Sequence, residues 1–397
     1  MQRPQQNLQL PPFENTSLSR VQLQVTRSGS SLALVNLGKC ALSVNGVTKQ
    51  CAQVTAGDVI EIGRQLALLC VQRPERFDGE SARHVFGEAD GNGIVGESPA
   101  IGQLRKEIAF VAAHTGHVLI LGASGTGKEL VAAAIHRLGR PAGPWVPRNA
   151  STFPETLLDA ELYGNAKGYP NVGAPERKGL VGAAHQGSLF LDEFAELPPS
   201  AQTHLLRVLD AGEYQRLGEA NTRHSDFRLI AATNQATSAL RADVRARFAF
   251  QIQVPELASR REDIALLARH WLRTLADNDP EIARRFFEHG EPQLSAEFAA
   301  HLTRLPLRGN VRELRNVLWQ AIAKSDANVL TFTAEQVAHP TPPIEREIGA
   351  AELQAALSAN QGSLEKTWRA LGLSSRFALM RLMKKNTVQI RRQPSGP

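Results

Sequence analysis

Cysteine is scarce in this 397-residue chain: only Cys40, Cys51 and Cys70 occur, all within the first 75 residues. Their spacings do not match a zinc site, so we expect small, buried apolar residues of a reduced protein. The 11 histidines are scattered, and none is assigned to a metal. A disulfide-stapled scaffold and a zinc-dependent fold are therefore excluded.

Long apolar runs are also missing. No stretch of 18 or more apolar residues occurs, as a membrane-spanning helix would require. The first residues, Met-Gln-Arg-Pro-Gln-Gln, lack the apolar segment of a secretory signal peptide. We therefore expect a soluble, cytoplasmic protein without membrane contact.

Positive charge is concentrated at one end. The net charge is +6, and residues 341–397 hold 9 Lys and Arg against 4 Asp and Glu. A basic C-terminal end on a nearly neutral body favours an anionic partner, and nucleic acid is the first candidate. The length predicts two or three domains, each with its own core.

The most informative motif is a glycine-rich turn, GASGTGKE, at residues 122–129. It follows the apolar residues 118–121, typical of a buried parallel strand, and precedes residues 130–135, which have helical composition. This is the setting of a phosphate loop, whose N–H groups and helix N-terminus attract phosphate. A glycine turn without a nucleotide is the alternative. The predicted ATP-binding residues, with Lys128 bridging the β- and γ-phosphates, are Gly122, Ala123, Ser124, Gly125, Thr126, Gly127, Lys128 and Glu129.

Glu129 stands where such loops usually have a Ser or Thr hydroxyl for Mg²⁺. The metal therefore needs another ligand, and residues 187–193 (GSLFLDE) form an apolar strand that ends in two acids. We predict that Asp192 holds Mg²⁺ and that Glu193 orients and activates the attacking water. A solvated strand end is the alternative, but the position 64 residues after Lys128 in an α/β pattern favours the catalytic interpretation.

Residues 1–75 are predicted to form an all-β module, because short apolar runs (21–25, 32–35, 41–44, 59–62 and 66–69) alternate with turn signals. Residues 18–22, 44–46 and 56–63 resemble the later part of a forkhead-associated (FHA) domain. Gln22 stands where that family has His, and Cys40 where it has Asn. The module is either a phosphothreonine reader or a degenerate β-sandwich that contacts a protein partner. Residues 76–92 suit a linker.

Several sequence blocks after residue 92 stand in the order of the AAA+ domain of sigma-54-dependent transcription activators, which this region resembles. The blocks are residues 93–98, 122–136, 148–150, 160–164, 187–193, 226–234, 260–263 and 309–316. The resemblance implies an α/β subdomain with a parallel sheet at residues 93–257, a helical lid at 258–330, and a hexamer that hydrolyses ATP to remodel sigma-54 RNA polymerase.

The resemblance also implies roles for single residues. Asn149 would restrain Glu193 until the γ-phosphate is sensed, and Thr233 with Asn234 would form sensor I. Arg312 would be sensor II in the lid. Arg241 and Arg247 would reach the neighbouring subunit's γ-phosphate, where developing charge needs a further cation, and Arg245 is a rival to Arg247.

The surface loop that contacts sigma-54 in this family reads GAFTGA. The corresponding residues here are Gly168, Tyr169, Pro170, Asn171, Val172, Gly173 and Ala174. Pro170 stiffens this loop and Val172 supplies no hydroxyl, while Tyr169 offers an apolar contact in place of Phe. The altered centre leaves the contact with sigma-54 open.

The C-terminal part resembles a Fis-type helix-turn-helix at residues 348–390, preceded by a linker at 331–347. Ser375, Arg376 and Phe377 would lie at the end that contacts base edges of double-stranded DNA, and Arg381, Lys384 and Lys385 would contact phosphates. A small helical bundle with a basic face is the alternative.

Together these features predict a multidomain chain: an FHA-like β-sandwich, an α/β AAA+ ATPase with a helical lid, and an all-α helix-turn-helix. The main functional hypothesis is a sigma-54-type transcription activator. A second is a DNA-binding regulator that uses ATP only to oligomerise, because of the altered loop. A third is an AAA+ remodeller outside transcription whose basic tail serves as an adaptor.

Overall fold

The computed structural model describes residues 16–73, 84–325 and 328–330, and beyond these only positions 353, 354, 357, 367 and 383. The chain divides into two units, Met1–Thr331 and Phe332–Pro397. The expected linker at 331–347 lies outside the described residues, as does the helix-turn-helix apart from those five positions. The predicted DNA contacts that fall outside are Ser375, Arg376, Phe377, Arg381, Lys384 and Lys385.

The N-terminal module consists of two antiparallel sheets, with strand orders β1-β2-β5 and β4-β3-β6-β7. Inward-facing residues of both sheets, among them Leu34, Leu42 and Val54, share one buried cluster. The predicted all-β module is confirmed, although the mostly exposed β4 and β5 were missed because they show no apolar alternation. The strands are β1 (Leu23–Ser28), β2 (Ser31–Asn36), β3 (Leu42–Val44), β4 (Val47–Lys49), β5 (Cys51–Val54), β6 (Val59–Ile62) and β7 (Leu66–Leu69).

The cysteines are less buried than expected. All three are free thiols, but Cys51 is exposed and Cys40 and Cys70 are only partly covered. Cys51 begins β5, which is an edge strand of its sheet, so one side of its backbone and side chain faces solvent. The expectation of buried cysteines is therefore wrong for Cys51.

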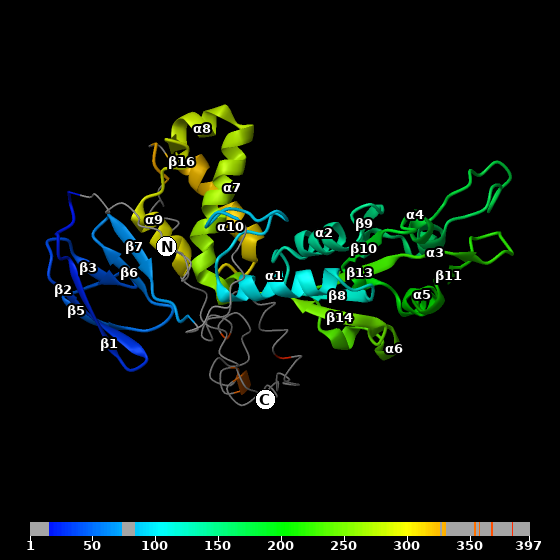
Figure 1. Ribbon diagram of the computed structural model, residues 1–397, viewed down its shortest axis with the longest axis horizontal. Helices are drawn as coiled ribbons and strands as arrows, with labels where there is room; N and C mark the ends of the chain where they lie inside the picture. The colour runs from blue at the N-terminus through cyan, green and yellow to red at the C-terminus, as the bar shows by residue number, and fades with distance from the viewer. Residues whose placement is uncertain are drawn as a thin grey trace, which may run out of the picture. The chain divides into compact units, whose positions relative to one another are not determined.

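The ATPase domain is built on a parallel five-stranded sheet in the order β14-β8-β13-β10-β9 (Figure 1). Neighbouring strands are all parallel, and the three central ones are buried almost throughout. Apolar strands covered on both faces are what an α/β sheet requires. The strands are β8 (His117–Leu121), β9 (Trp145–Asn149), β10 (Ser188–Asp192), β13 (Arg228–Thr233) and β14 (Phe248–Gln253).

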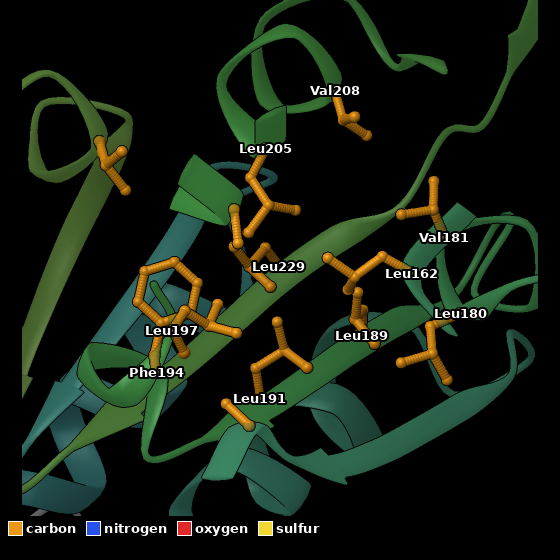
Figure 2. Close-up of a cluster of buried hydrophobic side chains, with 14 of the residues drawn as sticks. Leu162, Leu180, Val181, Leu189, Leu191, Phe194, Leu197, Leu205, Val208 and Leu229 are labelled. Carbon is orange, nitrogen blue, oxygen red and sulfur yellow. The ribbon is translucent and has the colours of Figure 1, made fainter. Parts of the chain in front are cut away.

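Helices cover both faces of this sheet. One cluster joins Val118 and Ile120 of β8 to α1 (Pro99–Ala112) and α2 (Lys128–Gly139). The alternate residues, such as Leu119, belong to a second cluster, which Figure 2 shows around Leu189, Leu191 and Phe194. That second cluster also draws on α3 (Leu158–Tyr163), α4 (Leu180–Ala183), α5 (Pro199–Ala211) and α6 (Ala242–Arg245). The predicted α/β core with a parallel sheet is confirmed.

A helical lid follows, as predicted. It consists of η5 (Leu257–Asp263), α7 (Ile264–Asn278), α8 (Pro280–Phe286), the short strands β15 (Phe287–Glu288) and β16 (Glu291–Pro292), α9 (Ala296–Arg304) and α10 (Asn310–Lys324). Ser295 caps α9 by accepting from the N–H of Phe298 at 3.0 Å, and Asp279 caps α8. The remaining short elements are η1 (Ala150–Thr152), η2 (Glu155–Leu157), η3 (Phe194–Glu196), η4 (Thr237–Ala239), β11 (Glu213–Tyr214) and β12 (Arg223–His224).

Within the first unit the β-module contacts the lid. The Arg261 guanidinium donates to the backbone oxygen of Gly57 at 2.7 Å, and Arg304 at the end of α9 forms an ion pair with Glu61 of β6. These two arginines connect two separate lid elements to the same β-module. Among the described residues, no helix is long and apolar enough to cross a membrane.

Candidate functional site

The phosphate loop lies between β8 and α2, where the sequence places it. Lys128 is the first residue of α2, and its ammonium donates to the backbone oxygens of Gly122 at 2.9 Å and Ala123 at 3.2 Å. Burial lowers the pKa of Lys128, while the carboxylates of Asp192 and Glu193 act in the opposite direction. The ammonium is thus held inside the loop, next to the two acids that end β10.

Gly125 is needed in the phosphate loop for a close contact with the lid as well as for the turn. Its φ is +77°, and a Cβ there would lie 2.3 Å from the backbone oxygen of Gly309 in the lid. Only glycine permits this approach, which brings the start of α10 onto the phosphate loop.

The two acids at the end of β10 differ in their surroundings. Glu193 adopts a left-handed backbone conformation, with φ of 52°, and its N–H donates to Oδ1 of Asp192 at 2.9 Å. A non-glycine residue in this region is strained, and such strain is common at functional sites. Hydrogen bonds from Ser151 and Asn149, aided by Lys128 and Arg312, hold the pKa of Glu193 below its ordinary value. These neighbours therefore favour the charged carboxylate form of Glu193.

Asn149 lies beside these acids because β9 pairs with β10 in a register that places Asn149 opposite Asp192. Its amide oxygen accepts from the N–H of Ser151 at 2.9 Å and from the Ser151 hydroxyl at 2.8 Å. Ser151 was not predicted as a site residue, because its place near the acids depends on how β9 pairs with β10.

The chemistry of the acids fits a phosphate-bound Mg²⁺. Among the described residues, no group of three or more His, Cys, Asp or Glu side chains is arranged to hold a metal ion. Mg²⁺ is commonly bound by one or two carboxylates together with substrate phosphates and waters, so Asp192 alone suffices beside a nucleotide. Asp192 and its neighbours do not supply enough ligands to bind a metal ion without a nucleotide.

The two sensor I candidates are placed differently. Thr233 ends β13, its backbone oxygen accepts from the N–H of Gly122 at 3.3 Å, and its hydroxyl accepts from the N–H of Gln235 at 3.0 Å. Thr233 is buried and occupied by backbone contacts, whereas Asn234 is exposed. Asn234 is thus the side chain of this pair that is open to a ligand.

The lid contacts the phosphate loop directly. The Arg312 guanidinium donates to the Ser124 hydroxyl at 2.9 Å, and the N–H of Val311 donates to the Gly125 oxygen at 3.0 Å. The buried amide of Asn310 donates to the Ser124 backbone oxygen at 3.0 Å and accepts from the N–H of Leu257 at 2.8 Å. Asn310 was missed as a site residue; its place directly after Gly309, at the first position of α10, is the available sequence signal.

A cavity of about 470 Å³ opens beside the phosphate loop, between α1, α2 and the lid. Its lining is mostly apolar, with Glu129, Arg260, His270 and Arg315 as its ionisable members, and such a lining suits a flat aromatic base. This pocket could not be predicted from the sequence, because its walls come from distant parts of the chain. Its lining includes Ile94, Val95, Leu130, Val254, Leu267 and Val311.

The arginines proposed to act on a neighbouring subunit are exposed but paired within the chain. Arg241 bonds both oxygens of Asp243, at 3.1 and 2.7 Å, and Arg247 forms an ion pair with Asp210. The Arg245 guanidinium makes no ion pair among the residues that the structure describes. Arg241 and Arg247 must each leave a carboxylate before reaching another subunit, whereas Arg245 need not.

The loop at residues 168–174 is braced at its base. The N–H of Gly168 donates to the Ala174 oxygen at 2.9 Å, and the buried Asn165 amide lies within 3.1 Å of the Ala166, Tyr169 and Pro175 oxygens. The Tyr169 ring covers Gly218 of the β11–β12 connection, where a Cβ would lie 2.6 Å from the ring. Val172 is fully exposed. The free apolar group at the tip is therefore Val172, while Tyr169 packs against the second loop.

Two protein-family models match this chain. A sigma-54 interaction domain matches residues 94–258, and an AAA+ ATPase lid domain matches residues 258–334. Both lie in the domain just described.

Individual proteins match as well. The chain is 41% identical to the Nif-specific regulatory protein of Bradyrhizobium diazoefficiens over 57% of its own length and 39% of that protein. It is 35% identical to the transcriptional regulatory protein ZraR of Salmonella typhimurium, over 74% of this chain and 68% of ZraR. Among solved structures, NtrX from Brucella abortus in complex with ATP has a TM-score of 0.53 and 31% identity, covering 74% of this chain and 68% of NtrX.

Proposed function

This chain belongs to the sigma-54-dependent transcription activators, whose central domain is an AAA+ ATPase, and from that premise we propose that it hydrolyses ATP to remodel sigma-54 RNA polymerase. The working form would be a ring of identical subunits, a hexamer. The segment beyond the lid would bind double-stranded DNA through a helix-turn-helix.

The observation that carries the proposal is the convergence of four charged groups at one end of the sheet. Lys128 interacts with Asp192 and Glu193, and Glu193 in turn interacts with Lys128 and Arg312. A glycine turn with a purely structural role needs neither a buried lysine whose charge is favoured by two acids nor an arginine from the lid. Binding and hydrolysis of a nucleoside triphosphate need all four.

The geometry gives each group a task. The phosphate-loop N–H groups and Lys128 would bind the phosphates, the apolar pocket the base, and Arg312 the γ-phosphate from the lid side. Mg²⁺, when bound at Asp192, would neutralise charge on the β- and γ-phosphates. Glu193 would accept a hydrogen bond from the attacking water and orient it toward phosphorus.

Arginines from a neighbouring subunit would complete the site, because the charge that develops on the transferred phosphoryl group exceeds what Lys128 and Arg312 offset. Arg241 and Arg247 are the arginines that the resemblance assigns to this role, and their present partners Asp243 and Asp210 would be exchanged for phosphate on ring assembly. Arg245 is the alternative, because it pairs with no carboxylate among the residues that the structure describes.

The altered loop supports a second candidate function, a DNA-binding regulator that uses ATP only to oligomerise. The deciding test is whether the protein with ADP–aluminium fluoride forms a complex with sigma-54 on size exclusion. A stable complex supports the activator. An ATPase that hydrolyses ATP and forms rings yet does not bind sigma-54 supports the second candidate.

If the activator proposal holds, Val172→Asp should abolish the complex with sigma-54 and leave the rate of ATP hydrolysis within about twofold. A charge at this exposed tip disrupts an apolar contact but changes no internal packing, and exposed substitutions of this kind have little effect on the fold. Co-elution with sigma-54 and the ATPase rate are measured on one preparation.

The matched control is Val25→Asp, at an exposed valine of β1 in the β-module. It should leave the complex intact. A complex that survives Val172→Asp but is lost in Tyr169→Ala would instead place the contact on Tyr169.

We also propose that the FHA-like module regulates the ATPase through the lid, since Arg261 and Arg304 connect two lid elements to it. Charge reversal Glu61→Lys should change the ATPase rate by about twofold or more, and Arg304→Glu in the same chain should restore it, because the pair would be re-formed with opposite signs. This role would be contradicted if all variants hydrolysed ATP at equal rates. It would also be contradicted if deletion of residues 1–80 changed neither the ATPase rate nor assembly.

A further inference from the structure

One wall of the cavity beside the phosphate loop is irregular backbone. Gly93, Ile94 and Val95 line the cavity. They belong to residues 93–97, here called the wall segment, which the structure describes throughout and which form no helix or strand. The backbone of the wall segment therefore has no regular ladder of hydrogen bonds to fix its position. The side chains that bind this backbone must set the position of the cavity wall.

An arginine of α1 binds the wall segment at two points. The Arg105 guanidinium donates through Nη1 to the Gly96 oxygen and through Nη2 to the Ile94 oxygen, each at 2.9 Å. Its Nε donates to Oδ2 of Asp90 at 2.8 Å. All three nitrogens of the planar group are thus used at once, which fixes the orientation of the guanidinium.

Asp90 holds the beginning of the same segment. Its Oδ1 accepts from the N–H of Asn92 at 2.8 Å and from the N–H of Ile94 at 3.0 Å. The side chains of Arg105 and Asp90 are only 21% and 12% exposed, so solvent ions screen this pair less than they screen a surface pair. Arg105, Asp90 and the backbone of Ile94 therefore form one hydrogen-bonded unit.

Arg105 connects two walls of the cavity to each other. Ile101 and Leu104, on the same helix, line the cavity directly, and Leu104 immediately precedes Arg105. The far end of the wall segment is held separately, because the N–H of Glu97 donates to Asp263 at 2.7 Å. Between these two ends, Arg105 fixes the distance from the wall segment to α1.

We propose that Arg105 is a positioning residue for the base of ATP, which holds the carbonyls of Ile94 and Gly96 against α1 and so keeps the cavity open to a flat ring. This inference rests on the proposed ATPase function. Arg105 acts through the wall segment. The phosphates would bind at the loop that holds Lys128, whose own contacts are to Gly122 and Ala123. The effect of Arg105 should therefore be confined to the base.

The test compares two ligands of the full chain by isothermal titration calorimetry in the presence of Mg²⁺. ATP carries the base, whereas inorganic tripolyphosphate carries phosphates alone. Arg105→Ala removes three hydrogen bonds around the wall segment, so it should weaken ATP binding about fivefold to thirtyfold and change tripolyphosphate binding by less than about twofold. In steady-state hydrolysis, KM for ATP should rise while kcat stays within about twofold, because the groups around the phosphates are unchanged.

Two further variants complete the test. Arg105→Lys keeps the charge but not the planar fork, so its ATP affinity should be intermediate, and it serves if alanine destabilises the fold. Arg137→Ala is the matched control: Arg137 is exposed on α2 and donates to the Asn92 oxygen at 2.8 Å, one residue before the wall segment. Its ATP affinity should stay within about twofold of wild type.

The two ligands separate the possible outcomes. Equal losses of ATP and tripolyphosphate binding in Arg105→Ala would assign Arg105 to the fold as a whole and overturn this inference. Unchanged ATP binding in Arg105→Ala, with a wild-type chain that binds ATP, would overturn it too. A wild-type chain that does not bind ATP would instead overturn the proposed ATPase function.

Discussion

Replacing Glu193 by glutamine should lower kcat for ATP hydrolysis by about 10²- to 10⁴-fold while ATP still binds. Glutamine preserves shape and hydrogen-bonding reach, but it has no charge and cannot take a proton from water. Asn149 and Ser151 lie beside this side chain, so the substitution is accommodated locally. The measurement is single-turnover hydrolysis, combined with equilibrium binding of a fluorescent ATP analogue.

Two control variants separate chemistry from binding. Glu196→Gln changes an exposed glutamate on the adjacent η3, which accepts from the Gln235 amide at 2.6 Å, and should hydrolyse ATP as wild type does. Lys128→Ala should lose both binding and hydrolysis, because it removes the ammonium that we predict to bridge the phosphates. Near-normal turnover in Glu193→Gln would show that another group activates the water.

Replacing Asp263 by alanine should lower the free energy of unfolding by about 3–5 kcal/mol. Asp263 is completely buried and accepts from the N–H of Glu97 at 2.7 Å, the N–H of Ser98 at 3.0 Å and the Ser98 hydroxyl at 2.6 Å. Alanine leaves these donors unpaired and removes the nearest negative charge from the buried Arg260. Urea unfolding followed by tryptophan fluorescence measures the loss.

Asparagine at this position should cost less than alanine. Burial raises the pKa of Asp263, so the environment disfavours its charge, and a neutral isostere keeps an acceptor for the two N–H groups. Asp277→Ala, at an exposed position of α7, is the matched control and should change stability by less than about 0.5 kcal/mol. Equal losses at Asp263 and Asp277 would show that the buried contacts contribute little.

Asp263 also connects stability to the site. Ser98 accepts from the N–H of Ile101 and so caps α1, and Ile101 lines the cavity beside the phosphate loop. Replacing Asp263 by alanine should therefore weaken ATP binding as well as lower the free energy of unfolding. The Arg-Arg-Glu-Asp segment at 260–263 could be found by resemblance, but its contacts 165 residues away could not.

The phosphate loop was predictable because everything that makes it lies within 20 successive residues. The expected strand at 118–121 is β8, and the expected helix begins at Lys128. The resemblance to the sigma-54 activators is confirmed by the family models, because its blocks are long and keep their order. Roles assigned to single residues, such as Asn149 and Arg241, remain predictions.

The sequence by itself determined the family, the α/β core, the lid and the all-β module, because local hydrophobic periodicity and continuous motifs carry that information. Only the tertiary structure decided which side chains share the site. The pairing of β9 with β10 brings Ser151 and Asn149 to Glu193, and the fold of the lid brings Arg312 to Ser124 across 188 residues of chain. Such contacts depend on strand order and helix packing, which no local stretch of sequence encodes.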